Sequence, residues 1–121
     1  MGKPAVQIDK LVADASMTPV VAETKVIVSR TVKLDGADVD AATTEDVIEV
    51  HAFATTPAMA VVSVPVKLSR SFQSVGVEVG VYLPCYKEEL PQAIEAAYEM
   101  VKERVMRELP LIKQALEDIA G

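Results

Sequence analysis

Residues 59–83 read MAVVSVPVKLSRSFQSVGVEVGVYL, and this stretch decides the fold. Apolar and polar residues alternate through most of it, and a period of two is typical of β-strands that bury one face. The spacing predicts one strand over about 59–71 and another over about 74–83. Pro65 cannot donate a hydrogen bond to a strand ladder, so the first of these strands is predicted to lie at a sheet edge or to carry a bulge. The residues predicted to face the core are Ala60, Val62, Val64, Val66, Leu68, Val75, Val77, Val79, Val81 and Leu83.

The alternation extends upstream of this stretch. Residues 24–34 place Val26, Val28, Val32 and Leu34 on one face and predict another strand. The dipeptide Asp35-Gly36 is typical of a turn, and we expect it to open a polar connection that reaches about residue 46. A further strand is predicted over about 47–55. We expect Ile48, Val50, Ala52 and Ala54 to face the core and Glu49, His51 and Phe53 to face the other way.

Downstream of Pro84 the period changes to that of a helix. Apolar residues then recur every three or four positions, which predicts a long helix over about 88–120. Pro110 lies inside this pattern and predicts a kink or a break, because proline removes one helical hydrogen bond and clashes with the preceding turn. Residues 1–20 are predicted as an N-terminal arm or a short helix. The helical apolar set is Ile94, Tyr98, Val101, Val105, Leu109, Ile112, Leu116 and Ile119.

Together these elements predict one α+β domain over residues 1–121. A four-stranded antiparallel meander over residues 24–84 packs against the long C-terminal helix, which is kinked or broken at Pro110. We expect one face of the sheet to be buried against the helix and the other, the wet face, to be exposed to solvent. A length of 121 residues suits a single domain of this kind.

The chain has a formal net charge of −6, which argues against a protein that coats nucleic acid with its whole surface. The charge is also segregated. Residues 35–49 contain six acidic residues and no Lys or Arg, whereas residues 57–77 contain Lys67 and Arg70 and no acid. No apolar run is long enough to span a bilayer and no secretory signal is visible, so we expect a cytoplasmic protein, in the host cytoplasm if it is phage-encoded.

Residues that could carry catalysis or bind a metal are scarce. His51 is the single histidine and Cys85 the single cysteine, so neither a histidine pair nor a zinc cluster can form. A Cys85–His51 nucleophilic pair is formally possible, but an isolated cysteine in an apolar setting is usually a small core residue. The acidic run 35–40 lacks the ligand order of a calcium loop. We therefore expect no enzymatic activity, no metal and no cofactor.

The wet face of the predicted sheet offers a different kind of site. It combines cations that can meet phosphates, hydroxyls that can donate hydrogen bonds and rings on which bases can stack. Arg30 and Arg70 fall with the apolar set by parity, and we expect their head groups to reach solvent at strand ends or bulges. Lys, Ser and Thr are also ordinary on the outer face of any two-layer domain. The candidate nucleic-acid contacts are Lys25, Arg30, Lys33, Phe53, Lys67, Arg70, Phe72 and Tyr82.

Residues 64–107 resemble a group of small bacteriophage and mobile-element proteins. The likeness rests on Val66-Lys-Leu-Ser-Arg-Ser71, on the Val-rich strand from Phe72 to Cys85, and on the helix that begins near Glu88. This chain lacks the Asn-Leu-Gly-Asn type of turn before Phe72 and has an additional N-terminal hairpin. Some members of the group are suggested to bind DNA during phage replication. The resemblance therefore implies a phage-type DNA-binding protein.

Two functional expectations follow. The first is a non-enzymatic, phage-type accessory protein that forms homo-oligomers and binds DNA through the basic wet face. Single-stranded DNA is favoured, because a flat sheet carrying rings suits unpaired bases better than a duplex groove. The alternative is a structural or protein-interaction module that oligomerises through the C-terminal helix or through an edge strand.

Overall fold

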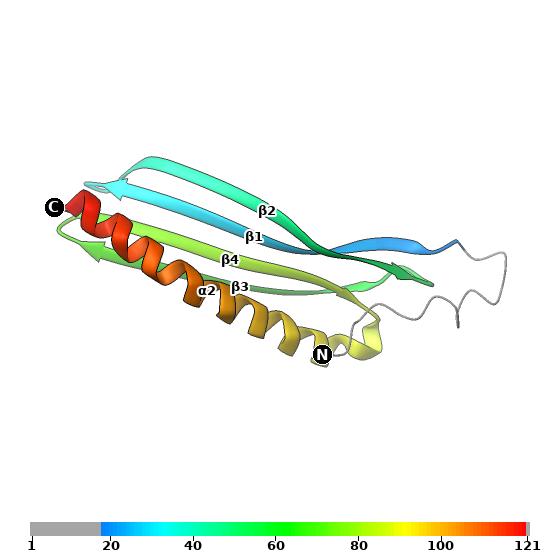
Figure 1. Ribbon diagram of the computed structural model, residues 1–121. Helices are drawn as coiled ribbons and strands as arrows, with labels where there is room; N and C mark the ends of the chain where they lie inside the picture. Colours follow the sequence, from blue (N-terminus) through cyan, green and yellow to red (C-terminus); the bar gives the residue numbers. More distant parts are fainter. Residues whose placement is uncertain (1–17, 121) are drawn as a thin grey trace.

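The computed structural model describes residues 18–120, so most of the predicted arm over residues 1–20 lies outside the described part of the chain. Four long strands are followed by a single turn of 3-10 helix and one long helix (Figure 1). No helix in residues 18–120 combines the length and the apolar composition that crossing a bilayer requires. The elements are β1 (Val20–Leu34), β2 (Ala37–Phe53), β3 (Ala58–Arg70), β4 (Gln73–Cys85), η1 (Lys87–Glu89) and α2 (Leu90–Ala120).

The strands form one antiparallel sheet in the order β2-β1-β4-β3. β1 and β2 make one hairpin, β3 and β4 make another, and the two hairpins join where β1 pairs with β4. α2 packs on one side of this sheet, against β4 and β3 (Figure 1). The predicted fold class, a four-stranded antiparallel sheet against a C-terminal helix, is confirmed.

The predicted polar connection over residues 35–46 is wrong, because most of it belongs to β2. Asp35 and Gly36 both have positive φ, as the central residues of a two-residue hairpin turn of type I′ require. Such a turn lets strand pairing resume at once, so β2 begins at Ala37 opposite Leu34. The first ten residues of β2 are exposed on both faces, and their strand conformation depends on pairing with β1.

The core lies between α2 and the face of the sheet that carries the even residues of β1 and the odd residues of β4. Val26, Val28, Val79 and Val81 are buried there, as the alternation predicted. The helix contributes Ala93, Ala97, Val101, Ile112 and Leu116 to the same cluster. Burial of each large apolar side chain in this layer contributes ~1.5–3 kcal/mol before conformational entropy is subtracted.

The predicted orientation of the 47–55 strand is wrong. Ile48 and Val50 are exposed, whereas His51 and Phe53 are buried. Both faces of this segment carry apolar atoms, so alternation alone does not select the inner one. Burying the Phe53 ring removes more apolar surface from water than burying a valine does. A bulge in β2, where the pairing skips Ile48 between Val47 and Glu49, then reverses the parity for the rest of the strand.

α2 runs without interruption from Leu90 to Ala120, with Pro110 in its interior. The predicted break at Pro110 is therefore wrong, while a kink there stays a prediction. Proline at this position cannot donate to the carbonyl of Met106 and its ring crowds that carbonyl.

We expect Pro110→Ala to stabilise the fold by about 1–3 kcal/mol, because alanine restores the missing helical hydrogen bond and Pro110 is exposed. Thermal unfolding followed by circular dichroism would show a higher melting temperature. Lys113→Ala, also exposed on α2, is the control and should change stability by less than about 0.5 kcal/mol. A melting temperature that falls in Pro110→Ala would contradict this account of α2.

Candidate nucleic-acid interface

The face of the sheet opposite α2, here termed the outer face, carries all three predicted lysines. Lys25 and Lys33 are odd residues of β1, opposite Tyr82 and Ser74 of β4. Lys67 of β3 pairs with Gly76, which in turn pairs with Thr31 of β1, so Lys67 projects to the same side. The lysines therefore share one surface, while the valines beside them face α2.

Two of these lysines already have acidic neighbours. The Lys25 Nζ lies 3.7 Å from a Glu23 carboxylate oxygen and 3.6 Å from one of Glu45. The Lys33 Nζ lies 3.6 Å from an Asp38 carboxylate oxygen. Exposed pairs of this kind contribute little to stability, about 0–1 kcal/mol, but they lower the local positive potential. No ion pair involves Lys67 or Arg70 within residues 18–120, and both residues are exposed.

Phe53 was predicted as a ring for base stacking, and the structure contradicts this because its side chain is 0% exposed. The ring packs edge-on against Tyr86, with centroids 5.1 Å apart, and lies 6.1 Å from the ring of His51. The Tyr86 hydroxyl accepts a hydrogen bond from the Ala54 backbone N–H at 2.6 Å. Phe53 therefore belongs to a packed aromatic group at the end of β2.

Arg30 was predicted to reach solvent from a strand end or bulge, and this position is wrong. Arg30 lies in the middle of β1 on the face that α2 covers. Its guanidinium donates from Nε and Nη2 to the two carboxylate oxygens of Glu108, both at 2.9 Å. Glu108 is 3% exposed and also accepts from Arg104 Nε at 3.3 Å. Arg30 thus connects β1 to α2, and its guanidinium is already paired with a carboxylate, which makes it a poor candidate for a phosphate contact.

Glu108 was missed in the sequence, although a signal for it was present. Its helical spacing from Val101 and Arg104 places it on the buried side of α2. A carboxylate at such a position needs a cationic partner from the sheet, and Arg30 was the arginine that parity had assigned to the apolar face.

Tyr82 lies on the outer face but does not stand free. It is half-buried, and its ring leans along β4 over Gly80, where an added Cβ would meet the Tyr82 ring at 3.5 Å. Ser63 borders the same place at 3.8 Å. The ring is therefore partly covered, which leaves it less suited to stacking than the sequence indicated.

Phe72 is the most exposed of the predicted rings, with 87% of its surface accessible. It occupies the turn between β3 and β4, where Ser71 has φ 52° and Phe72 has φ 70°. The left-handed region costs a residue other than glycine roughly 1–2 kcal/mol, so the chain holds this ring outward at an energetic disadvantage. The Phe72 carbonyl accepts a hydrogen bond from the Asp35 N–H at 3.0 Å, which fixes the two hairpin turns side by side.

The turns bring four predicted residues to one end of the sheet. We term Lys33, Lys67, Arg70 and Phe72 the turn-end patch. Lys33 and Lys67 lie on the strands that flank β4, and the small residues Ser74 and Gly76 lie between them. Arg70 falls on the α2 side by parity. It is the last residue of β3, and a position at a strand end is what the sequence predicted for it. Lys25 and Tyr82 lie further along the sheet, outside the patch.

Cys85 and His51 do not form a nucleophilic pair. Cys85 is buried, and desolvation raises the pKa of its thiol, to which the negative charge of Glu89 adds. The thiolate fraction at neutral pH is therefore low. The His51 Nε2 is 2.7 Å from the Thr24 Oγ1 within the interior. Within the described residues no group of three or more His, Cys, Asp or Glu side chains is arranged to hold a metal ion.

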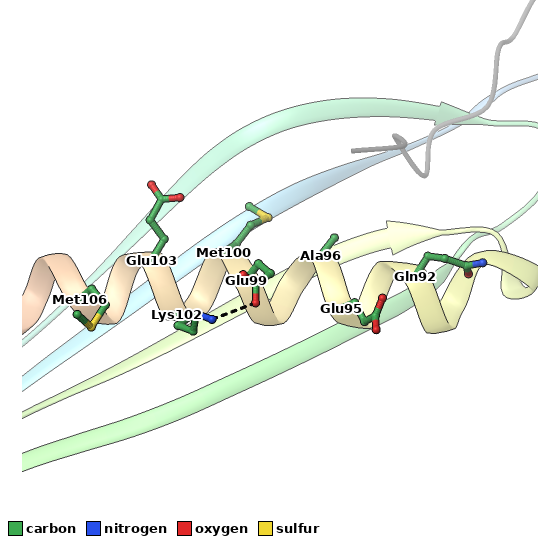
Figure 2. A pocket seen from close by; sticks show the side chains of 8 residues that line it. All are labelled: Gln92, Glu95, Ala96, Glu99, Met100, Lys102, Glu103 and Met106. Atoms are coloured by element: carbon green, nitrogen blue, oxygen red, sulfur yellow. Dashed lines mark ion pairs between the residues drawn. The ribbon is translucent and has the colours of Figure 1, made fainter.

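A hollow of about 590 Å³ lies away from this patch, along α2 (Figure 2). Its described lining comes from α2 alone and includes Glu95, Glu99 and Glu103 against the single cation Lys102, whose Nζ lies 3.4 Å from Glu99. The acidic excess makes it unsuitable for phosphate.

Comparison of the chain with protein-family models, with curated proteins and with solved structures found no match.

Proposed function

We propose that this chain is a non-enzymatic cytoplasmic protein that binds single-stranded DNA through the turn-end patch. The observation that carries the proposal is Phe72, a ring 87% exposed and held in a left-handed conformation at a hairpin tip. Backbone strain of this kind is often associated with function. Lys67, Arg70 and Lys33 surround the tip with positive charge. The resemblance to phage proteins that is seen in the sequence agrees with this role.

The chemistry of the patch suits an unpaired strand. A base that stacks on an aromatic side chain contributes ~1–3 kcal/mol whatever its identity. A ring at a narrow tip can reach a base only where that base is not already stacked in a duplex. The cations flanking Phe72 are then within reach of the phosphates on either side of the stacked nucleotide.

The acids near the patch limit how strong the binding can be. Asp38 forms an ion pair with Lys33 and so reduces its positive potential, and Asp35 lies in the adjoining turn. We therefore expect about three phosphate contacts, from Lys33, Lys67 and Arg70. Three contacts to a single strand give a slope near −2 in a plot of log affinity against log salt.

Titration of a fluorescent oligothymidine, followed by anisotropy, tests the proposal. We expect affinity to fall roughly 20-fold between about 50 and about 200 mM salt, and duplex DNA of the same length to bind less tightly. No binding at the lower salt concentration would overturn the proposal, as would a salt slope near zero.

The matched variants are Phe72→Gly, Phe72→Trp and Lys113→Ala. Phe72→Gly should reduce affinity roughly tenfold while raising stability by about 1 kcal/mol, because glycine removes both the ring and the backbone strain. Phe72→Trp should retain binding, and Lys113→Ala on α2 should leave it unchanged. Equal affinity for Phe72→Gly and the natural chain would show that the ring has no part in binding.

A further inference from the structure

The sheet ends in two edge strands of opposite charge. β2 carries acidic residues and no Lys or Arg, whereas β3 carries Lys67 and Arg70 and no acid. In residues 18–120 no strand pairs with the outer side of either one. Unpaired edges offer free backbone N–H and C=O groups to another chain. The acids of β2 are Asp38, Asp40, Glu45, Asp46 and Glu49.

We propose that copies of this chain assemble edge to edge, with β2 of one copy pairing with β3 of the next. Neighbouring strands alternate in direction across the sheet, so β2 and β3 run in opposite directions. A second copy that is moved along the sheet without being turned over therefore presents its β2 antiparallel to β3. Both helices then lie on the same side of one continuous antiparallel sheet.

The exposed valines of the two edges match in this arrangement. One row of paired residues crosses the outer face from Val47 through Lys25 and Tyr82 to Val61, so its two ends are Val47 and Val61. They are 47% and 49% exposed. If each row continues from one copy into the next, Val61 of one copy lies opposite Val47 of its neighbour. Directly opposed side chains are about 5 Å apart. The contact covers apolar surface that each copy alone leaves in water.

The charges match at the turn end of the same interface. Ser69 and Asp38 are the ends of one outer-face row, so Lys67 lies diagonally across from Asp38 of the next copy. On the α2 side, Leu68 and Asp40 end one row, and Arg70 is diagonal to Asp40 in the same way. Diagonal neighbours are ~7–8 Å apart, which long side chains can span. Pairing β2 with β2 would instead oppose acid to acid.

A hollow of about 650 Å³ lies between β3 and α2, lined by Val62, Ile94 and Tyr98 together with Glu95 and Glu99. The row of paired residues that begins at Val62 on β3 ends at Asp46 on β2, so Asp46 of the next copy would lie opposite Val62. Ile48 follows Val47 along β2 and is also exposed, so the neighbour adds further apolar surface at this end of the contact.

Pro65 limits the interface to a known extent. It removes one donor from β3, and in the shared register it faces Thr43 of the next copy, so the ladder lacks at most one hydrogen bond there. Since the two contacting surfaces differ, a contact leaves a free β2 at one end and a free β3 at the other. Assembly then continues to a closed ring or an open filament.

The experiment measures mass by native mass spectrometry and analytical ultracentrifugation over a range of protein concentrations. We expect species larger than dimers that grow with concentration or end in one closed ring. Val47→Lys and Val61→Lys each place a charge at the centre of one edge and should each raise the dissociation constant at least roughly tenfold. A chain that stays monomeric at all concentrations overturns the proposal.

Mixing the two variants gives the decisive result. Val47→Lys keeps an intact β3 edge and Val61→Lys keeps an intact β2 edge, so an equal mixture should form heterodimers and nothing larger. Symmetric pairing through either edge predicts no such rescue, and its absence refutes the head-to-tail contact.

Met106→Lys is the control, because this exposed residue lies on α2 and should assemble like the natural chain. Dissociation by Met106→Lys would assign the contact to the helix instead. Lys67 and Arg70 take part in both proposals, but Val47 and Val61 lie outside the turn-end patch and Phe72 lies outside both edge strands. The valine variants therefore test assembly alone and Phe72→Gly tests DNA binding alone, so the two proposals can fail independently.

Discussion

Glu108→Ala is expected to destabilise the protein by about 2–4 kcal/mol, which lowers the melting temperature by roughly 8–15 °C. Glu108 is 3% exposed and receives two hydrogen bonds from Arg30 and one from Arg104. Removing it leaves two cations beside the core without their main partner. The Arg30 side chain is 34% exposed, so solvent relieves part of the cost and the effect falls below that of a fully buried pair.

Thermal and urea unfolding of Glu108→Ala and Glu103→Ala measure this difference. Glu103 lies on the same helix, but its ion pair with Arg107 at 3.7 Å is exposed, so its loss should cost less than about 0.5 kcal/mol. Equal melting temperatures for the two variants would show that the Arg30–Glu108 contact does not stabilise the attachment of α2 to β1.

Phe53→Ala is expected to reduce the free energy of unfolding by about 3–5 kcal/mol, more than Glu108→Ala. The ring is 0% exposed and packs edge-on against Tyr86, so its removal leaves a cavity and deprives Tyr86 of its ring partner. Near-ultraviolet circular dichroism should lose intensity in the tyrosine region, and the midpoint of urea unfolding should fall.

Phe72→Ala is the matched control, because it deletes the same atoms from a ring that is 87% exposed. Its stability should change by less than about 0.5 kcal/mol. A Phe53→Ala variant as stable as Phe72→Ala would mean that the end of β2 is not packed as described. The pair also separates two of the three predicted stacking rings, because under the proposed DNA binding only Phe72→Ala should lower DNA affinity in a chain that stays folded.

The sequence predicted the parts of the fold in which the two faces of a strand differ. In β4, Val75 to Leu83 alternate with small or polar residues, so the buried face could be assigned without a structure. The first half of β2 could not be found in this way, because polar residues there occupy both faces. The bulge at Ile48 was also beyond prediction, since one extra residue reverses the parity and leaves no mark in the composition.

The candidate site was predicted in part for the same reason. Parity correctly placed Lys25, Lys33 and Lys67 on one face, because it depends on the strand alone. The neutralising partners Glu45 and Asp38 depend on the register between strands, which the sequence does not give. The strain at Phe72 was likewise invisible, because it arises from the turn geometry that joins β3 to β4.

The strand order has a consequence for the way this chain folds. Each hairpin closes over a two-residue turn, so β1–β2 and β3–β4 can each zip up locally and quickly. The centre of the sheet forms only when Lys25 meets Tyr82 and Leu34 meets Gln73, which are remote in sequence. Closing so large a loop costs entropy before the contacts repay it, so we expect the docking of the two hairpins to limit the folding rate.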